Sequence, residues 1–222
     1  MTTALSRTQI ARRAAQDIPD GAYVNLGIGL PTLVANFVPK DREVIYHSEN
    51  GILGMGPAPA PGTEDPDLIN ASKQYVTLLP GASIFHHTDA FIMMRGGHLD
   101  LALMGAFEVS CTGDLANWAT LDDKTPPGVG GAMDLAAGAK AVWVLMDHTT
   151  KDGRPRIVEQ CTYPLTARGV VKRIYTSLAV IDVTPDGLFV REMAPGLSFD
   201  ELQARTGAPL RLANDWRPIA ID

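Results

Sequence analysis

Two segments with continuous apolar stretches restrict the fold of this chain more than any other feature of its sequence. One lies in AKAVWVLMD (139–147), and the other lies in LDLALMGAF (99–107). A strand with one face in water carries polar side chains at every second position, whereas a continuous apolar run is typical of a strand buried on both faces. The two segments therefore predict the central strands of a sheet with helices on both of its faces.

Further strands and helices are expected around these two segments. AYVNLGIG (22–29) is predicted to be a strand that ends at glycine, and Pro31 suits the first turn of a helix after it. REVIYHSE (42–49) and YVTLLPGA (75–82) have the composition of two more strands. Near the N-terminus, Ser6 is a suitable cap for a first helix. The order of these elements is that of an α/β protein.

The C-terminal part of the chain has a different pattern. Two alternating runs in LAVIDVTPDGLFVREM (178–193) flank the turn residues PDG, which predicts a β-hairpin. Ser198 and Glu201 have the spacing of a capping box at the start of a helix. The whole pattern predicts one α/β domain over residues 1–222. Its sheet is expected to be open and mostly parallel, flanked by helices, with antiparallel additions near the C-terminus.

Composition excludes several classes of protein. The chain has 222 residues and a formal net charge of −6, so its overall field does not favour nucleic acid. Its two cysteines are too few for a disulfide framework. No apolar run is as long as a membrane span, and the basic N-terminal segment lacks the apolar core of a secretory signal. We therefore expect a cytoplasmic protein that binds neither nucleic acid nor a membrane.

Motifs for metals and common cofactors are also missing from the sequence. His86 and His87 would point to opposite faces if they lay on a strand, and no other histidine pair has helical i, i+4 spacing. GIGLPT (27–32) lacks the third glycine of a dinucleotide fingerprint, and no GK[ST] motif of a nucleotide-binding loop occurs. The sequence therefore predicts no metal, no NAD and no nucleoside triphosphate.

Serine and cysteine nucleophiles are not favoured either. Neither Ser48 nor Ser110 stands in a GxSxG elbow, and Cys111 has no obvious base beside it in the sequence. Structural roles are the better interpretation for all three.

Glu49 is the carboxylate with the most unusual surroundings. In HSENGILGMGP (47–57) it follows a predicted strand and precedes three closely spaced glycines. A glutamate can attack an acyl carbon and divide a difficult transfer into two easier steps. Backbone amides of glycines can stabilise the resulting oxyanions without steric obstruction. We therefore predict Glu49 to be a nucleophile, and we expect the neighbouring glycines to leave room for a bulky thioester.

The sequence around Glu49 resembles the active-site signature of the β subunits of family I CoA-transferases. HSENGILG carries that signature, and further similar stretches follow in the family's order over nearly the whole chain. They include YVNLGIGLPTLV, DPDLINASKQYVTLLPGAS, GVGGAMDLAAGAK and CTYPLTARGVVKRIYTSLAVIDV. The resemblance implies the open α/β sheet that this family shares with ribose-5-phosphate isomerase.

The resemblance also implies site residues. The family's catalytic glutamate corresponds to Glu49, the asparagine near the thioester to Asn25, and the glycine whose amide meets it to Gly130. The remaining predicted CoA and thioester contacts are Gly29, Asn50, Gly51 and Gly131. The CoA thioester is a substrate in this chemistry, so no separate cofactor is predicted.

Substrates and partners are further expectations from the resemblance. CoA would move from succinyl-CoA to a 3-oxoacid through a glutamyl-CoA thioester. FHHTDAFIMMRGGHLD (85–100) is most similar to members that act on 3-oxoadipate, which makes His86, His87 and Arg95 candidates for binding its distal carboxylate. An α subunit is expected as a separate chain, in a heterodimer or an α2β2 assembly. The alternatives are an acetoacetate enzyme and a non-catalytic ligand-sensing module on the same fold.

Overall fold

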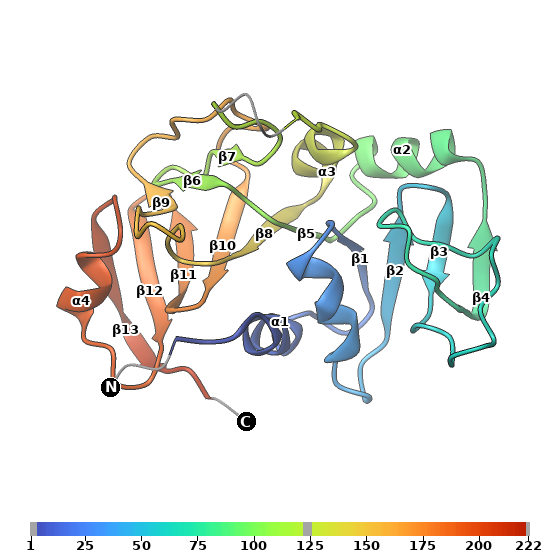
Figure 1. Cartoon of the computed structure of the whole chain (residues 1–222), viewed down its shortest axis with the longest axis horizontal. Coiled ribbons are helices and arrows are strands. Elements are labelled where there is room, and N and C mark those ends of the chain that lie inside the picture. The colour runs from blue at the N-terminus through green and yellow to red at the C-terminus, as the bar shows by residue number, and fades with distance from the viewer. Residues whose placement is uncertain (1–3, 122–125, 221–222) are drawn as a thin grey trace.

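The computed structural model describes residues 4–121 and 126–220, and its main feature is a ten-stranded sheet (Figure 1). The strands lie in the order β13-β12-β11-β10-β8-β5-β1-β2-β3-β4. Their bounds are β1 (Ala22–Leu26), β2 (Val44–Ser48), β3 (Ile52–Met55), β4 (Leu78–Ile84), β5 (Leu101–Met104), β8 (Ala141–Met146), β10 (Val171–Thr176), β11 (Ala179–Thr184), β12 (Gly187–Met193) and β13 (Leu210–Pro218). A second, three-stranded sheet has the order β7-β6-β9, formed by β6 (Glu108–Ser110), β7 (Leu115–Ala116) and β9 (Ile157–Val158).

The two continuous apolar stretches form adjacent strands at the centre of the large sheet, as predicted. β5 and β8 pair in parallel, and β5 also pairs in parallel with β1. All four residues of β5 are buried, and in β8 only Ala141 and Trp143 are partly exposed. The parallel centre brings the carboxyl ends of β1, β2 and β5 to the same edge, where ligands of open α/β sheets bind.

Antiparallel strands flank this centre on both sides, and not only near the C-terminus. β10, β11 and β12 are antiparallel neighbours, which confirms the predicted hairpin. On the other side, β3 and β4 continue the sheet in antiparallel fashion from β2. The prediction placed additions at one end only, because the four-residue β3 between glycines gives little sequence signal. β13 is a further difference, since it pairs in parallel with β12.

Helices lie on opposite sides of the strands (Figure 1). α1 (Arg7–Ala15) packs with the 3-10 helix η1 (Leu30–Asn36), and both contact β8. α2 (His87–Arg95) packs against α3 (Ala132–Gly138) on the side away from α1. The fifth helix, α4 (Phe199–Gln203), lies next to β13 at the end of the sheet. The predicted caps of α1 at Ser6 and of α4 at Ser198 are both present as capping boxes.

Buried ion pairs attach α1 to the sheet. Arg13 Nε donates to Glu192 at 2.6 Å, and Arg13 Nη1 donates to Asp17 at 2.8 Å. Arg173 donates to both Asp17 and Asp182. We call Arg13, Asp17, Arg173, Asp182 and Glu192 the α1 charge network. Within it, each charge has an opposite partner and most of its members are buried or half-buried.

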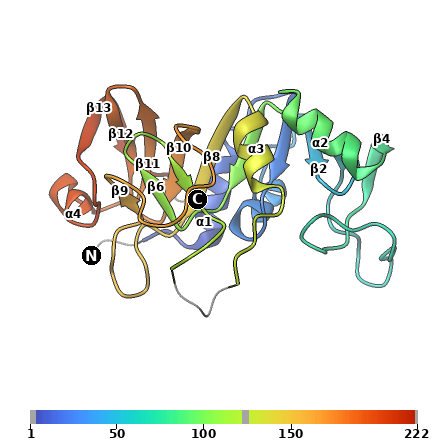
Figure 2. The same cartoon turned by 90° about the horizontal axis from the view of Figure 1, so that it is seen from above.

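The segment between β3 and β4 projects away from the sheet as extended loops (Figure 2). The two ends of this segment are hydrogen-bonded to each other: the Thr77 amide donates to the Pro57 carbonyl, and the Gly56 amide donates to the Thr77 carbonyl. In the part of the chain that the structure describes, no helix has the length and apolar character that crossing a bilayer requires.

Candidate active site

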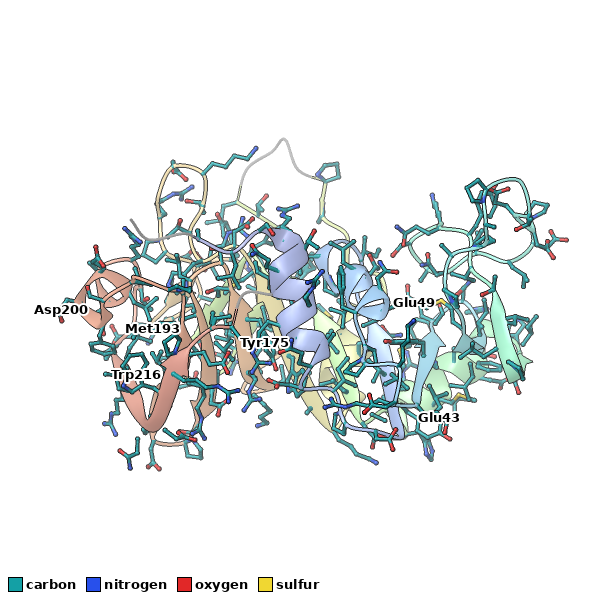
Figure 3. All side chains as sticks on the ribbon, turned by 90° about the horizontal axis from the view of Figure 1, so that it is seen from below. Glu43, Glu49, Tyr175, Met193, Asp200 and Trp216 are labelled. Atoms are coloured by element: carbon teal, nitrogen blue, oxygen red, sulfur yellow. The ribbon has the colours of Figure 1, made fainter. Side chains whose placement is uncertain are left out.

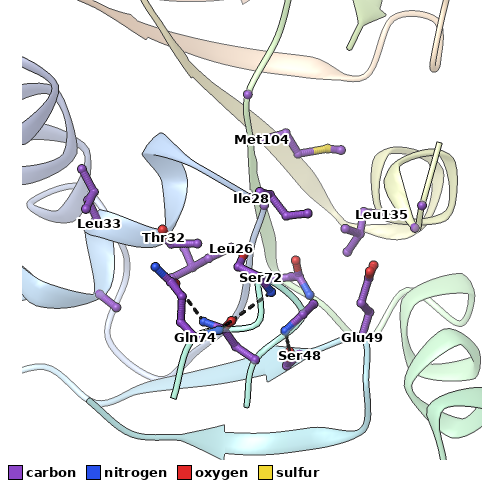
Figure 4. Close-up of a pocket in the computed structure, with 18 of the residues that line it drawn as sticks. Leu26, Ile28, Thr32, Leu33, Ser48, Glu49, Ser72, Gln74, Met104 and Leu135 are labelled. Carbon is purple, nitrogen blue, oxygen red and sulfur yellow. Dashed lines mark hydrogen bonds between the residues drawn. The ribbon is translucent and has the colours of Figure 1, made fainter. Parts of the chain in front are cut away.

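A cavity of about 570 Å³ opens at the carboxyl ends of β1, β2 and β5 (Figure 4). Residues that follow these three strands line it, together with the loop before α3 and part of the β3–β4 segment. The predicted site residues that reach it are Asn25, Glu49, Gly130 and Gly131. Residues distant in the sequence therefore meet at the edge of the sheet where the parallel strands end.

Glu49 occupies the tip of β2, directly after its last residue, Ser48. A tight turn follows, in which the Gly51 amide donates to the Ser48 carbonyl at 3.0 Å. The turn requires glycine at position 51, because its φ is +104° and a Cβ there would collide with the Phe85 carbonyl. The turn leaves the Glu49 side chain pointing toward Leu135 of α3, across the cavity (Figure 4).

Gly131 lies directly against the Glu49 carboxylate. A Cβ built on Gly131 would stand only 2.1 Å from Glu49 Oε2, so any larger residue would displace the carboxylate. Gly130 has a φ of +50° and open space around it. Among the described residues, none accepts a hydrogen bond from the amide of either glycine. The two amides are therefore available to a ligand beside Glu49.

Burial raises the pKa of Glu49, and the nearby Asp134 raises it further. Asp134 in turn accepts a hydrogen bond from Arg95 Nε at 2.6 Å. Within residues 4–121 and 126–220, no side chain or amide forms a hydrogen bond or ion pair with the Glu49 carboxylate. A carboxylate without partners, in surroundings that disfavour its charge, is more basic and more nucleophilic than one on the surface.

Asn25 and His47 form a buried pair between β1 and β2. Asn25 Nδ2 donates to His47 Nδ1 at 3.0 Å and to the His47 carbonyl at 3.1 Å. Burial lowers the pKa of His47, although the backbone of Ala90 opposes the shift. A neutral ring with Nδ1 as acceptor is consistent with both observations. The pair fixes the orientation of the Asn25 amide at the cavity wall.

Asn50 and Gly51 do not line the cavity. Asn50 Oδ1 accepts a hydrogen bond from Ser48 Oγ at 2.6 Å, and Asn50 Nδ2 donates to the Ile69 carbonyl at 2.7 Å. Ser48 Oγ also accepts from the Ala71 amide. These bonds hold the 70–76 loop, which does line the cavity, against the strand tip. Asn50 therefore acts on the cavity through this loop.

Gly29 also lies outside the cavity wall, although its neighbour Ile28 forms part of it. It has a φ of +93° and precedes η1. Its conformation turns the chain from β1 into that helix.

The three candidates for binding a distal carboxylate lie on α2, outside the cavity lining. His86 is the N-cap of α2 and accepts from the Thr88 amide, and His87 is the first residue of that helix. Arg95 is largely exposed, is paired with Asp134, and lies over the ring of Phe91. In these positions His86 caps the helix and Arg95 packs on its surface. Arg95 is linked to Glu49 only indirectly, through Asp134.

Arg156 is a cavity residue that the sequence did not single out. It stands just before the two-residue strand β9, in a segment with a recognisable turn but no motif. Asn117 and the 70–76 loop also line the cavity, and neither was predicted as part of the site, although the loop lies within DPDLINASKQYVTLLPGAS, a stretch that carries the resemblance. For Arg156, the only available signal was an arginine next to a short apolar run.

Comparisons with known proteins point to one family. The family model described as coenzyme A transferase matches residues 7–205. Similar relatives include the B-type subunit of the 3-oxoadipate CoA-transferase of Pseudomonas putida, 62% identical over 95% of this chain and 98% of its own length. The B-type subunit of the succinyl-CoA:3-ketoacid coenzyme A transferase of Helicobacter pylori is 48% identical over 91% of this chain and 97% of its own length.

A solved structure extends the agreement to the fold. An acyl-CoA transferase from Escherichia coli O157:H7 matches 99% of this chain and 45% of its own, with a TM-score of 0.73 and 19% sequence identity. At that identity the match bears on the fold alone, and it confirms the predicted α/β architecture. Together with the family match over most of the chain, it leads to one assignment: the chain is a member of the coenzyme A transferase family.

Proposed function

We propose that this chain is the β subunit of a CoA-transferase that moves CoA from succinyl-CoA to a 3-oxoacid, with Glu49 as the nucleophile. The observation that carries the proposal is the Glu49 carboxylate itself. It stands at a strand tip inside a cavity, beside two glycine amides without described acceptors and with no described partner of its own.

The chemistry proceeds in two balanced halves. The Glu49 carboxylate attacks the thioester carbon of succinyl-CoA, and the C–S bond breaks to give a mixed anhydride and the CoA thiolate. The thiolate attacks the glutamyl carbonyl, and succinate leaves with the former bridging oxygen. In the second half the carboxylate of the 3-oxoacid attacks the glutamyl thioester and releases the thiolate, which then attacks the 3-oxoacyl carbonyl. Glu49 returns as a free carboxylate.

The site supplies what each step requires. Attack at either carbonyl places negative charge on an oxygen, and the donors that we propose for it are the amides of Gly130 and Gly131, which have no acceptor among the described residues. The Asn25 amide, held by His47, offers a second polar group at the cavity wall. The raised pKa of Glu49 favours attack, because burial disfavours its charge in the resting state. No separate cofactor is needed for this sequence of steps.

The acceptor we propose is 3-oxoadipate. The relatives named for that substrate, from Pseudomonas putida and Acinetobacter baylyi, are 62% and 60% identical to this chain. The Helicobacter pylori relative, named for 3-ketoacids, is 48% identical. The higher identity to the former supports a dicarboxylic acceptor, and acetoacetate is the second candidate.

The proposed enzyme also contains an α subunit as a separate chain. We propose that the enzyme is located in the cytoplasm. The relatives covered over almost their whole length are named as the B-type subunits of their enzymes. A human relative, in contrast, is matched over 96% of this chain but only 42% of its own length, as expected if both halves were joined in one chain. The heteromer could be a heterodimer or an α2β2 assembly.

The test is transfer by the chain co-expressed with its α subunit. We expect CoA transfer from succinyl-CoA to 3-oxoadipate with kcat/KM at least about tenfold above that for acetoacetate, since an added charge-assisted contact has roughly that effect. Equal or better use of acetoacetate would select the second candidate. Absence of transfer to either acceptor would favour a ligand-sensing module instead.

A further inference from the structure

Arg156 has a rigid backbone but an unsatisfied side chain. Its amide donates to the His148 carbonyl at 3.2 Å, and its carbonyl accepts from the Val109 amide of β6 at 2.9 Å. These bonds fix the residue between β6 and the segment after β8, at the wall of the Glu49 cavity. A charged group that is held in place at a cavity wall can bind a ligand without reorganisation.

Arg156 is half-buried, and its guanidinium lacks the partners that its buried part requires. Its Nε is buried without any hydrogen bond, and Nη1 reaches only the Ala106 carbonyl, at 3.5 Å. No carboxylate of residues 4–121 or 126–220 lies within ion-pair distance. Arg154, two residues earlier, is exposed and is nevertheless paired with Asp152 at 2.8 Å. A buried donor without a partner is costly, so such a group marks a place where an acceptor binds.

Arg156 lines the same cavity as Glu49 but is not its ion-pair partner. Among the described residues, no ion pair within 4.0 Å joins the two side chains. A substrate whose reacting carbonyl meets Glu49 would extend its other end toward this wall.

We propose that Arg156 binds the distal carboxylate of dicarboxylic acyl groups and so determines the specificity of the site. The inference rests on the proposed function, in which succinyl-CoA and 3-oxoadipate both carry such a carboxylate. Since both acyl groups react at Glu49 in turn, one cation at a fixed place serves both halves of the reaction. The planar fork of arginine matches a carboxylate with two parallel hydrogen bonds.

The first test compares two acceptors that differ only at their distal end, 3-oxoadipate and 3-oxohexanoate. In a ping-pong reaction the kcat/KM of the acceptor reports the second half-reaction, so effects on succinyl-CoA do not enter. Arg156→Gln in the complex with the α subunit should lower kcat/KM for 3-oxoadipate at least about tenfold. For 3-oxohexanoate the change should stay within about twofold. The control Arg154→Gln should leave both values unchanged.

A second measurement does not depend on turnover. Calorimetric titration of the complex with adipate should give at least about tenfold weaker binding in Arg156→Gln than in wild type, and hexanoate should bind both alike. Equal losses for both acceptors, unchanged adipate binding, or loss of the α subunit from the variant would overturn the proposal. Failure of the wild-type complex to transfer CoA would refute the proposed function, whereas the adipate titration would still decide the role of Arg156.

Discussion

Charged side chains are paired with one another in the α1 charge network but have no ion-pair partners in the Glu49 cavity. In the network, Arg13 donates to Glu192 and to Asp17, and Arg173 donates to Asp17 and Asp182. In the cavity, neither Glu49 nor Arg156 has an ion pair with any described residue. Tyr175, whose hydroxyl donates to Asp17 of the network at 2.7 Å, lies beside α1 in Figure 3, and Glu49 lies farther along the sheet.

The difference shows which charges serve the fold and which serve the reaction. A paired buried charge costs little to keep and much to disrupt, because removal of one partner leaves the other without compensation. An unpaired charge costs stability in the resting protein and is available to a substrate. Substitutions in the network should therefore affect stability, and substitutions in the cavity should affect activity.

The largest effect is expected from Glu49→Ala, which removes the nucleophile. The complex should lose more than about 10⁴-fold in kcat, with folding and assembly intact. Glu49→Asp should also be severely impaired, because one missing methylene moves the carboxylate out of attack geometry. Steady-state assays of both variants provide the check, and near-normal turnover in either would refute the assignment.

Arg13→Met should have a large effect on stability and none on chemistry. It leaves Asp17 without its Arg13 contact and removes one of two arginines on Glu192, since Arg217 also donates to Glu192 at 2.8 Å. With Arg217 in place, we expect the free energy of unfolding to fall by about 3 kcal/mol, at the low end for disruption of a buried pair. Urea unfolding measures it.

The exposed Arg7, paired with Asp147, supplies the matched control for Arg13. Arg7→Met should change the free energy of unfolding by less than about 1 kcal/mol. If Arg13→Met behaved like Arg7→Met, the network would not have the stabilising role that the comparison assigns to it.

His148 is a buried titratable residue that is uncharged and has a hydrogen-bond partner at each ring nitrogen. It is buried between two hydroxyls, with Nδ1 2.8 Å from Thr176 Oγ1 and Nε2 2.9 Å from Thr206 Oγ1. Burial, with help from the charge of Arg205, lowers the pKa of His148 from 6.5 to about 4. As pH falls, His148 binds a proton in the unfolded chain before it does so in the folded protein. The stability that neutral His148 contributes is therefore complete above pH 6.5 and is lost toward pH 4, by up to roughly 3 kcal/mol.

Urea unfolding of wild type and His148→Gln between about pH 7.5 and pH 4 isolates that contribution. The variant should be less stable than wild type at the upper end of this range and should show a weaker dependence on pH. Parallel pH curves for the two proteins would show that His148 does not produce the acid sensitivity.

The smallest effect is a gain in stability in Glu49→Gln. Burial raises the pKa of Glu49, so the folded protein holds its proton more tightly, and wild-type stability falls as pH rises from 4.5 through the raised pKa. The neutral amide removes this cost. We expect Tm to rise by less than about 4 °C at about pH 8, and the difference to shrink below about pH 4.5. A lower Tm of the variant than of wild type at about pH 8 would contradict the expectation that the charge of Glu49 destabilises the resting protein.

Periodicity and capping predicted most of the fold. The continuous apolar stretches became β5 and β8, the alternating runs became β11 and β12, and the Ser6 and Ser198 caps are in place. These features depend on neighbours in the sequence. Strands β3 and β4 were not predicted to be antiparallel to the sheet, because pairing between strands depends on tertiary contacts and not on local pattern.

The candidate site was predictable only where a motif carried it. Glu49 and Gly131, both site candidates from the resemblance, are adjacent in space, whereas Arg156 enters the cavity from a segment without a motif. The helix N-cap at His86 was not predicted, since the sequence alone did not distinguish it from a loop or extended backbone. Long-range placement of single side chains is not encoded in local spacing.

The central claim is that Glu49 forms a covalent thioester with CoA. The most direct measurement is mass spectrometry of this chain after the complex with its α subunit has reacted with succinyl-CoA and no acceptor. The account predicts a mass increase of one CoA less one water, located on the peptide that contains Glu49, and its disappearance when 3-oxoadipate is added. An unmodified chain with full transfer activity, or the same adduct in Glu49→Gln, would contradict it.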